Sequence, residues 1–205
     1  GAAYHKSGDK QQAIKDYNKA IELNPHHAWA YYNRGLIYDD LGNVQQAITD
    51  YEKAVEIDPQ IAEAYYNIGN DYAKLGNKQQ AIKYFDKAIE TNPQFSSAYI
   101  NRGIAYGGMG NARQAIKDFD KAIELNSQDA MAYANRGIAY GKIGNQLQAI
   151  ADFDKALVVD PDNAGTHYNR GMAYQDMGNL EAAMNDYDKA LSINPKDLSA
   201  LFARA

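Results

Sequence analysis

The sequence contains no cysteine. Disulfide bonds and thiolate metal sites are therefore excluded, whatever the redox state of the compartment. The chain also has no apolar run near the roughly 18 residues that a membrane-spanning helix needs, and no secretory signal peptide opens it. We therefore expect a soluble protein without a membrane partner, and among compartments we favour the cytoplasm.

Positive charge is in short supply. The chain has 21 lysines and arginines against 26 aspartates and glutamates, which gives a net charge of -5. Nucleic-acid binding needs a basic face that neutralises phosphates, and this sequence offers none. We therefore expect no nucleic acid among its partners.

What the chain does contain is a 34-residue period without insertions. If Ala28 is position 1, glycine always stands at positions 8 and 15, tyrosine at position 11, alanine at positions 20 and 27, and an aromatic residue at position 24. Proline stands at position 32 in four of the five copies. The full copies are residues 28–61, 62–95, 96–129, 130–163 and 164–197.

This pattern resembles the tetratricopeptide repeat (TPR) family, whose unit is a helix-turn-helix of the same length. The resemblance implies an all-α fold, a TPR α-solenoid in which antiparallel helix pairs stack in a right-handed superhelix. One position departs from the family. The usual leucine at position 7 is arginine in four copies (Arg34, Arg102, Arg136 and Arg170), and only Ile68 is apolar.

The same register extends to both ends of the chain. Residues 1–27 match positions 8 to 34 of a partial repeat, and residues 198–205 match the first eight positions of a seventh. We therefore expect residues 1–205 to form a single TPR solenoid and to be a fragment of a longer array.

Within each repeat, apolar residues recur at helical spacing. Positions 4, 8 and 11 give the first helix one buried stripe, and positions 20, 21, 24, 27 and 28 give the second helix another. The glycine at position 15 suits the left-handed residue that follows a helix. The Asn or Asp next to it suits the following N-cap, and proline at position 32 ends the second helix.

The arginine at position 7 varies together with position 23. Aspartate occupies position 23 wherever position 7 is arginine, whereas Tyr84 occupies it in the copy with Ile68. This joint change predicts an Arg-Asp contact within each repeat and an apolar Ile68–Tyr84 contact in its place. The alternative is that both side chains are solvated and the match is accidental.

Position 6 is asparagine in all five full repeats: Asn33, Asn67, Asn101, Asn135 and Asn169. We call these residues the asparagine row. The row is similar to the asparagine ladder that lines the TPR superhelix of O-linked N-acetylglucosamine transferase and holds peptide main chain. A carboxamide both donates and accepts hydrogen bonds, so it can pair with any peptide backbone. The alternative is that these asparagines serve helix packing or solubility.

The resemblance implies that positions 2, 5, 6, 9, 12 and 13 face the concave surface. Position 5 and position 9 are mostly apolar or aromatic, which suits an extended peptide with spaced hydrophobic side chains. Besides the asparagine row, the candidate peptide-binding residues are Tyr32, Tyr66, Ile100, Tyr168, Leu36, Ile104, Ile138 and Met172. Each of these side chains can also serve packing between repeats.

Catalytic and metal-binding patterns find little support. His26 and His27 lack the third ligand that a zinc site needs, and His167 replaces a core-edge tyrosine. No nucleophile stands with a base, and the cationic residues with which TPR domains clamp chaperone tails are absent. We therefore expect no enzyme, no cofactor and no metal.

Three functions are compatible with this sequence. The leading hypothesis is a protein-protein interaction scaffold that binds an extended peptide segment on its concave face. The first alternative is a self-assembling scaffold, in which the tail of one molecule stacks head to tail on the first repeat of the next. The second is the non-catalytic targeting arm of a larger enzyme.

Overall fold

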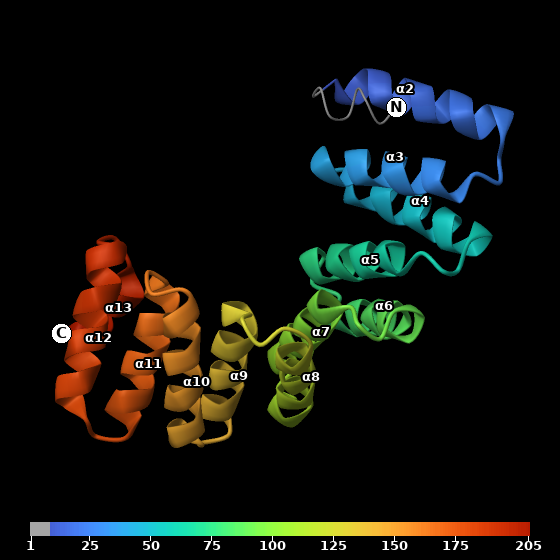
Figure 1. Cartoon of the computed structure of the whole chain (residues 1–205). Helices are drawn as coiled ribbons and strands as arrows, with labels where there is room; N and C mark the ends of the chain where they lie inside the picture. The colour runs from blue at the N-terminus through green and yellow to red at the C-terminus, as the bar shows by residue number, and fades with distance from the viewer. Residues whose placement is uncertain (1–8) are drawn as a thin grey trace. The chain divides into compact units, whose positions relative to one another are not determined.

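The protein is all-helical throughout residues 9–205, the part that this computed structural model describes (Figure 1). The helices are α2 (Lys10–Leu23), α3 (Ala28–Asp40), α4 (Val44–Ile57), α5 (Ala62–Lys74), α6 (Lys78–Thr91), α7 (Ser96–Gly108), α8 (Ala112–Leu125), α9 (Ala130–Lys142), α10 (Gln146–Val159), α11 (Ala164–Asp176), α12 (Leu180–Ile193) and α13 (Leu198–Arg204). The first helix of each full repeat thus covers positions 1 to 13 and the second covers positions 17 to 30.

Contacts divide the chain into two units, Gly1–Asn101 and Arg102–Ala205. In the first unit, α3 packs against α4 and α5 against α6. In the second, α9 packs against α10 and α11 against α12. Each unit is therefore built from helix pairs that follow the sequence period, as the pattern predicts.

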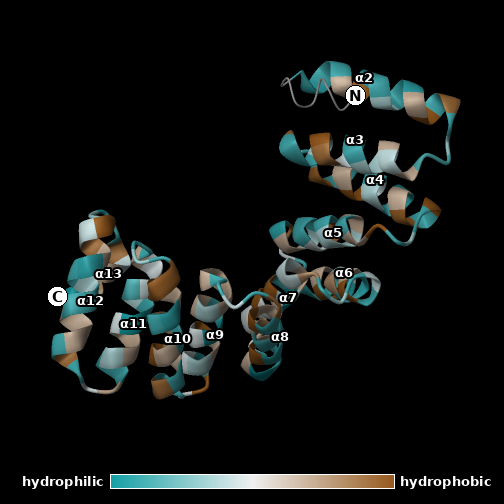
Figure 2. Cartoon of the chain, in the orientation of Figure 1, coloured by the Kyte–Doolittle hydropathy of each residue, from teal (hydrophilic) through white to brown (hydrophobic). Residues whose placement is uncertain are grey.

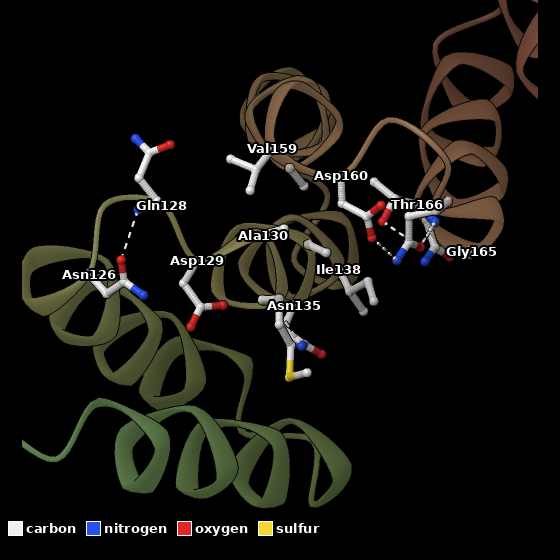
Figure 3. Close-up of a pocket in the computed structure, with 15 residues that line it drawn as sticks. Asn126, Gln128, Asp129, Ala130, Asn135, Ile138, Val159, Asp160, Gly165 and Thr166 are labelled. Atoms are coloured by element: carbon white, nitrogen blue, oxygen red, sulfur yellow. Dashed lines mark hydrogen bonds between the residues drawn. The ribbon is translucent and has the colours of Figure 1, made fainter.

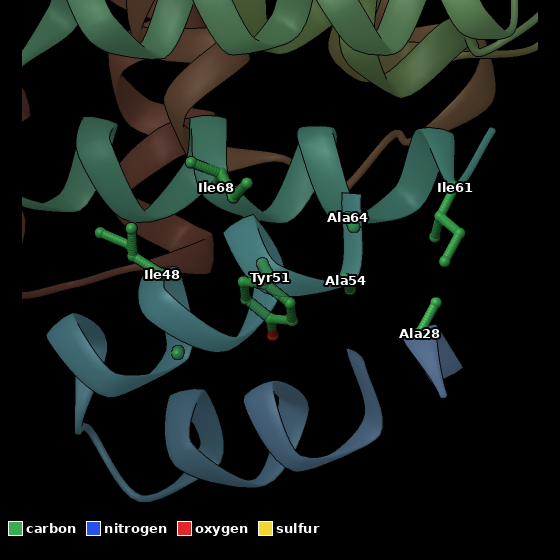
Figure 4. Packing of buried hydrophobic residues seen from close by; sticks show 8 residues of the cluster. Ala28, Ile48, Tyr51, Ala54, Ile61, Ala64 and Ile68 are labelled. Carbon is green, nitrogen blue, oxygen red and sulfur yellow. The ribbon is translucent and has the colours of Figure 1, made fainter. Parts of the chain in front are cut away.

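Each helix pair interlocks through the glycine at position 8. A Cβ atom placed on Gly35 would lie 2.7 Å from the ring of Tyr51, and one on Gly69 would lie 2.5 Å from the ring of Phe85. The missing side chain lets the aromatic ring of the second helix press against the backbone of the first. Figure 4 shows Tyr51 among the buried side chains of its cluster, which include Ile48 and Ile68.

The turn between the two helices of a pair is also fixed by sequence. Glycine at position 15 has φ between 77° and 82° in every full repeat, a conformation that residues with a Cβ rarely adopt. The next asparagine caps the second helix through its side chain at Asn77, Asn111, Asn145 and Asn179. Asn43 occupies the same place, but its side chain makes no capping hydrogen bond.

At the start of the chain, α2 supplies the second helix of the partial repeat, capped by the Asp9 side chain. The predicted matches at Gly1, Tyr4 and Gly8 lie outside the described residues. At the other end, α13 begins where a seventh repeat is predicted to begin.

Hydrophobic and hydrophilic residues are mixed along every described helix (Figure 2). This mixture reflects stripes that face a neighbouring helix on one side and solvent on the other. No helix in residues 9–205 is long and apolar enough to cross a membrane.

Candidate functional site

All members of the asparagine row are half-buried on the first helices of their repeats. The first unit holds Asn33, Asn67 and Asn101, and the second holds Asn135 and Asn169. Half-burial leaves part of each carboxamide accessible to a partner. The hydrogen bonds of each amide decide how much of its capacity remains.

In the first unit, two members of the row are joined to the tyrosine at position 5 of the preceding repeat. Nδ2 of Asn67 donates to Oη of Tyr32 at 3.4 Å. Nδ2 of Asn101 donates to Oη of Tyr66 at 3.1 Å and to Oδ1 of Asn70 at 2.7 Å. Neighbouring repeats are thus linked through the side chains at positions 5 and 6.

Two other members bond to their own helix. Nδ2 of Asn33 donates to the carbonyl oxygen of Trp29 at 2.7 Å, and Nδ2 of Asn135 donates to that of Met131 at 2.9 Å. Each of these amides uses one of its N–H groups in this way and keeps the other. These bonds orient the side chain and leave part of its hydrogen-bonding capacity unused.

The side-chain oxygens of the row are not used by the described part of the chain. Among the residues that the structure describes, none of these oxygens accepts a hydrogen bond, and Asn169 makes no side-chain hydrogen bond at all. An amide oxygen is the acceptor that a peptide N–H requires. The row therefore retains the group needed to hold a main chain.

In the second unit, the row lines a hollow of about 570 Å³ (Figure 3). Met131, Ala134, Asn135 and Ile138 contribute from α9, which places positions 2, 5, 6 and 9 on one surface. Asn169 of α11 lies on the same hollow. The positions that the resemblance assigned to one face are thus brought together in this repeat.

A smaller hollow of about 130 Å³ shares Ile138 and Asn169 with the first. Gly141 at position 12 and Asp176 at position 13 also line it. The two hollows therefore follow each other between α9 and α11. Together they form a groove, which we call the α9/α11 groove.

The candidate peptide-binding residues beside the asparagine row differ in how much of their side chain is exposed. Ile104 is 43% exposed and Met172 is 37% exposed, whereas Ile100 is only 4% exposed and offers almost no surface. The remaining candidates are half-buried: Tyr32, Tyr66, Tyr168, Leu36 and Ile138. The three tyrosines pack on the aromatic residue at position 24 of their own repeat, with ring centroids 5.7 to 6.0 Å apart.

The predicted Arg-Asp contact is present in every repeat that has the arginine. In the first of them, Nε and Nη2 of Arg34 donate to the two carboxylate oxygens of Asp50 at 2.7 and 2.6 Å. The same two-point pairing joins Arg102 to Asp118, Arg136 to Asp152 and Arg170 to Asp186. Hydrogen bonding to Asp50 raises the pKa of Arg34.

Each of three arginines also reaches the preceding repeat, at position 25. Nη1 of Arg34 donates to Asn18, Nη1 of Arg136 donates to Asp120, and Nη1 of Arg170 donates to Asp154, each at 2.6 Å. The arginine therefore ties two repeats together. Sequence reasoning missed this contact, although acidic or amide residues at position 25 are visible in every repeat.

In the repeat with Ile68, Tyr84 takes the place of the Arg-Asp ion pair. Tyr84 packs on the cluster that contains Ile68 and stacks on Tyr72, with ring centroids 5.5 Å apart. Its hydroxyl donates to the Glu52 carboxylate, at position 25 of the preceding repeat, at 2.8 Å. Tyr84 thus supplies both the apolar contact and the link between repeats.

The three histidines within residues 9–205 do not form a site. His167 is 8% exposed, and its ring nitrogens lie 3.1 Å from Oδ1 of Asp186 and 3.0 Å from the carbonyl oxygen of Pro161. This is a structural position at the edge of the core. No group of three or more potential metal ligands occurs within residues 9–205.

Sequence comparison covers most of the chain. The tetratricopeptide repeat profile matches residues 28–61, 62–95, 96–129 and 164–197. Two further repeat profiles of the same kind match residues 1–42 and 142–178 and residues 119–151. No curated protein was found to match the chain.

Solved structures with similar folds span most of the chain. YrrB, described as a TPR protein with an unusual peptide-binding site, is 29% identical with a TM-score of 0.78 and covers 92% of this chain and 97% of its own. A MamA protein is 27% identical, with a TM-score of 0.75 and coverages of 82% and 92%. TTC0263 from Thermus thermophilus, a thermophilic TPR protein, is 26% identical, with a TM-score of 0.65 and coverages of 86% and 96%.

Proposed function

The chain belongs to the tetratricopeptide repeat family, and from that premise we propose that it binds an extended segment of a partner protein along its asparagine row. The family membership makes the chain a scaffold for protein interaction. The binding mode is the part that we propose. In this mode the row pairs with the main chain of the partner, and apolar residues beside the row receive its side chains.

The proposal rests on the unused side-chain oxygens of the asparagine row. Its amides are half-buried and oriented by bonds such as Asn135 to Met131, yet their oxygens accept no bond from the described residues. A half-buried amide oxygen without a protein partner is free to accept a hydrogen bond from the backbone N–H of a bound peptide. The peptide-binding site named for YrrB, a similar structure, agrees with a binding role for this fold.

The second unit gives the row an accessible setting. Asn135 and Asn169 both line the larger hollow, and Asn169 continues into the smaller one. An extended peptide advances about 3.3 Å per residue, and adjacent helices lie roughly 10 Å apart, so successive asparagines meet about every third residue. A segment in the α9/α11 groove would therefore contact both amides within about four residues.

The experiment begins with a random library of peptides of about 15 residues, from which binders of the wild-type chain are selected. The double variant Asn135→Ala and Asn169→Ala is then titrated with the selected peptides. Each lost hydrogen bond contributes about 0.5 to 1.5 kcal/mol, so we expect affinity to fall by roughly fivefold to a hundredfold for peptides in this groove.

The matched control is Asn185→Ala on α12. Asn185 is exposed and lines neither hollow. Affinity should not change in this variant, and the melting temperature of the double variant should stay close to that of the wild type. Equal affinity of the double variant and the control for every selected peptide would overturn the proposal.

A second candidate function is self-association through α13. Leu198 is 68% exposed and Phe202 is 81% exposed, which places two large apolar side chains on one short helix. A second copy of the chain would bury them in a head-to-tail contact. Sedimentation velocity over a hundredfold concentration range tests this candidate. Association that disappears in Phe202→Ser supports it, and a monomer at all concentrations excludes it.

A further inference from the structure

The larger hollow adjoins a repeat whose side chain at position 5 is the smallest of the five full repeats. The tyrosines Tyr32, Tyr66 and Tyr168 all occupy this position, and each ring lies close to the aromatic ring at position 24. The fourth repeat has Ala134 instead. Ala134 lines the hollow, and its methyl group cannot fill the volume of a phenol ring.

The same substitution leaves an amide without its partner. In the first unit, the hydroxyl groups of Tyr32 and Tyr66 receive hydrogen bonds from the asparagines one repeat later. The asparagine one repeat after Ala134 is Asn169. It lines the same hollow as Ala134 and makes no side-chain hydrogen bond to the described residues. The site thus lacks both the ring and the hydroxyl that Tyr32, Tyr66 and Tyr168 supply at position 5 of their repeats.

Neighbouring residues keep the space open and give it an apolar wall. Gly165 at position 2 of the next repeat also lines the hollow, where other repeats have residues as large as Trp29 and Met131. Ile138 and Ala156 contribute apolar surface. Phe153, the aromatic residue at position 24 of this repeat, lines the adjoining smaller hollow.

We propose that this hollow is a specificity pocket for a tyrosine side chain of the bound segment. The phenol ring of the partner takes the place that Tyr32 and Tyr66 occupy in their repeats, roughly 6 Å from the ring of Phe153. Its hydroxyl pairs with the Asn169 carboxamide. The pocket rests on the proposed peptide-binding function, for which it names the residue that anchors the partner.

Charge at the rim raises the rival case of a basic side chain. Asp129 and Asp160 line the hollow, and no lysine or arginine of the described residues does. Both carboxylates already accept hydrogen bonds, Asp129 from the backbone N–H of Ala132 at 3.0 Å and Asp160 from Nδ2 of Asn163 at 3.0 Å. The space beside Ala134 and the Asn169 amide both match a phenol, so we favour tyrosine. Binding of a basic side chain is the alternative that the test below distinguishes.

The test uses small molecules that isolate the side chain from the peptide. The full chain is titrated with 4-methylphenol, toluene and butylguanidinium, and binding is followed by NMR through the methyl groups of Ala134 and Ile138. We expect 4-methylphenol to bind more tightly than toluene by roughly twofold to tenfold, the contribution of one hydrogen bond. In Asn169→Ala this preference should disappear while toluene binding remains.

Ala134→Tyr fills the pocket with the residue that three other repeats have at position 5, and it should abolish the binding of 4-methylphenol without loss of stability. Ala151→Tyr, at an exposed position of α10, is the matched control and should bind as the wild type does. Tighter binding of butylguanidinium than of 4-methylphenol, or no binding of 4-methylphenol, overturns the tyrosine pocket. If the phenol does not bind but peptide binding still depends on Asn135, the proposed peptide-binding function stands and only the tyrosine pocket is overturned. If the phenol binds but no peptide does, the proposed peptide-binding function is overturned instead.

Discussion

The guanidinium of Arg136 donates two parallel hydrogen bonds to the carboxylate of Asp152, Nε to Oδ2 at 2.7 Å and Nη2 to Oδ1 at 2.6 Å. The Asp152 side chain is 4% exposed and that of Arg136 is 15% exposed. Removing one partner of such a pair leaves a charge that is buried and uncompensated. The pair is therefore a sensitive point of the helix hairpin.

We expect Arg136→Ile to lower the free energy of unfolding by about 3 to 5 kcal/mol, because the Asp152 carboxylate then loses its counter-charge. The double variant Arg136→Ile and Asp152→Tyr reproduces the pairing of Ile68 with Tyr84. We expect it to recover at least half of that loss. Urea unfolding of the two variants and the wild type measures both quantities.

The control for this pair is Lys53→Ala. Lys53 and Glu56 form an exposed ion pair at 2.9 Å, and exposed pairs contribute about 0 to 1 kcal/mol. A similar loss in Lys53→Ala and Arg136→Ile, or a double variant less stable than Arg136→Ile, would contradict the role assigned to the buried pair.

Two glycines of α9 are expected to respond in opposite directions to alanine. A Cβ on Gly137 would lie 2.7 Å from the ring of Phe153, whereas one on Gly141 would come no closer than 3.5 Å to Gln146. Gly137→Ala should destabilise the protein by about 1 to 3 kcal/mol through overpacking. Gly141→Ala should stabilise it by up to about 1 kcal/mol through helix propensity. Melting curves that shift in the same direction would refute this assignment.

Asp71 should make stability depend on pH. It is fully buried at position 10, where the other full repeats have isoleucine or alanine. Its Oδ1 accepts a hydrogen bond from Lys74 at 3.0 Å, and its Oδ2 has no partner. Burial raises the pKa of Asp71 to about 6 from the ordinary 3.8, so the folded protein favours the neutral acid.

The contribution of Asp71 is therefore fully present below pH 3.8 and is lost as the pH rises through about 6. A shift of this kind is worth on the order of 1 to 3 kcal/mol. Asp71→Ala should be more stable than the wild type at pH 8, and its advantage should shrink toward pH 4. Parallel stability curves for the two proteins between these pH values would contradict the raised pKa.

The periodic features of the fold follow from sequence because each is repeated. Glycine at positions 8 and 15 predicts the close helix pair and the turn, and both are confirmed at Gly35 and Gly42. The Arg-Asp contact was predictable because positions 7 and 23 change together, as the pair Ile68 and Tyr84 shows. Repetition supplies the comparison that a single domain lacks.

Contacts between repeats were not predictable in the same way. The bond from Arg136 to Asp120 and that from Asn101 to Tyr66 depend on how one hairpin stacks on the next, which a period does not specify. The hollow beside Ala134 was missed for a related reason. From the sequence, Ala134 is simply a small apolar residue. Only the structure shows that no neighbouring side chain fills the space beside it.

If the asparagine row holds the main chain of a partner, replacing single backbone amides of the bound peptide by esters should reveal each hydrogen bond. In a peptide selected on the wild type, each backbone amide in turn is replaced by an ester, which removes one N–H donor and leaves the side chains unchanged. At the residue that faces Asn135, the ester should weaken binding to the wild type by roughly twofold to tenfold. It should have no effect on binding to Asn135→Ala. An ester effect of equal size in both proteins at every backbone position would contradict the claim.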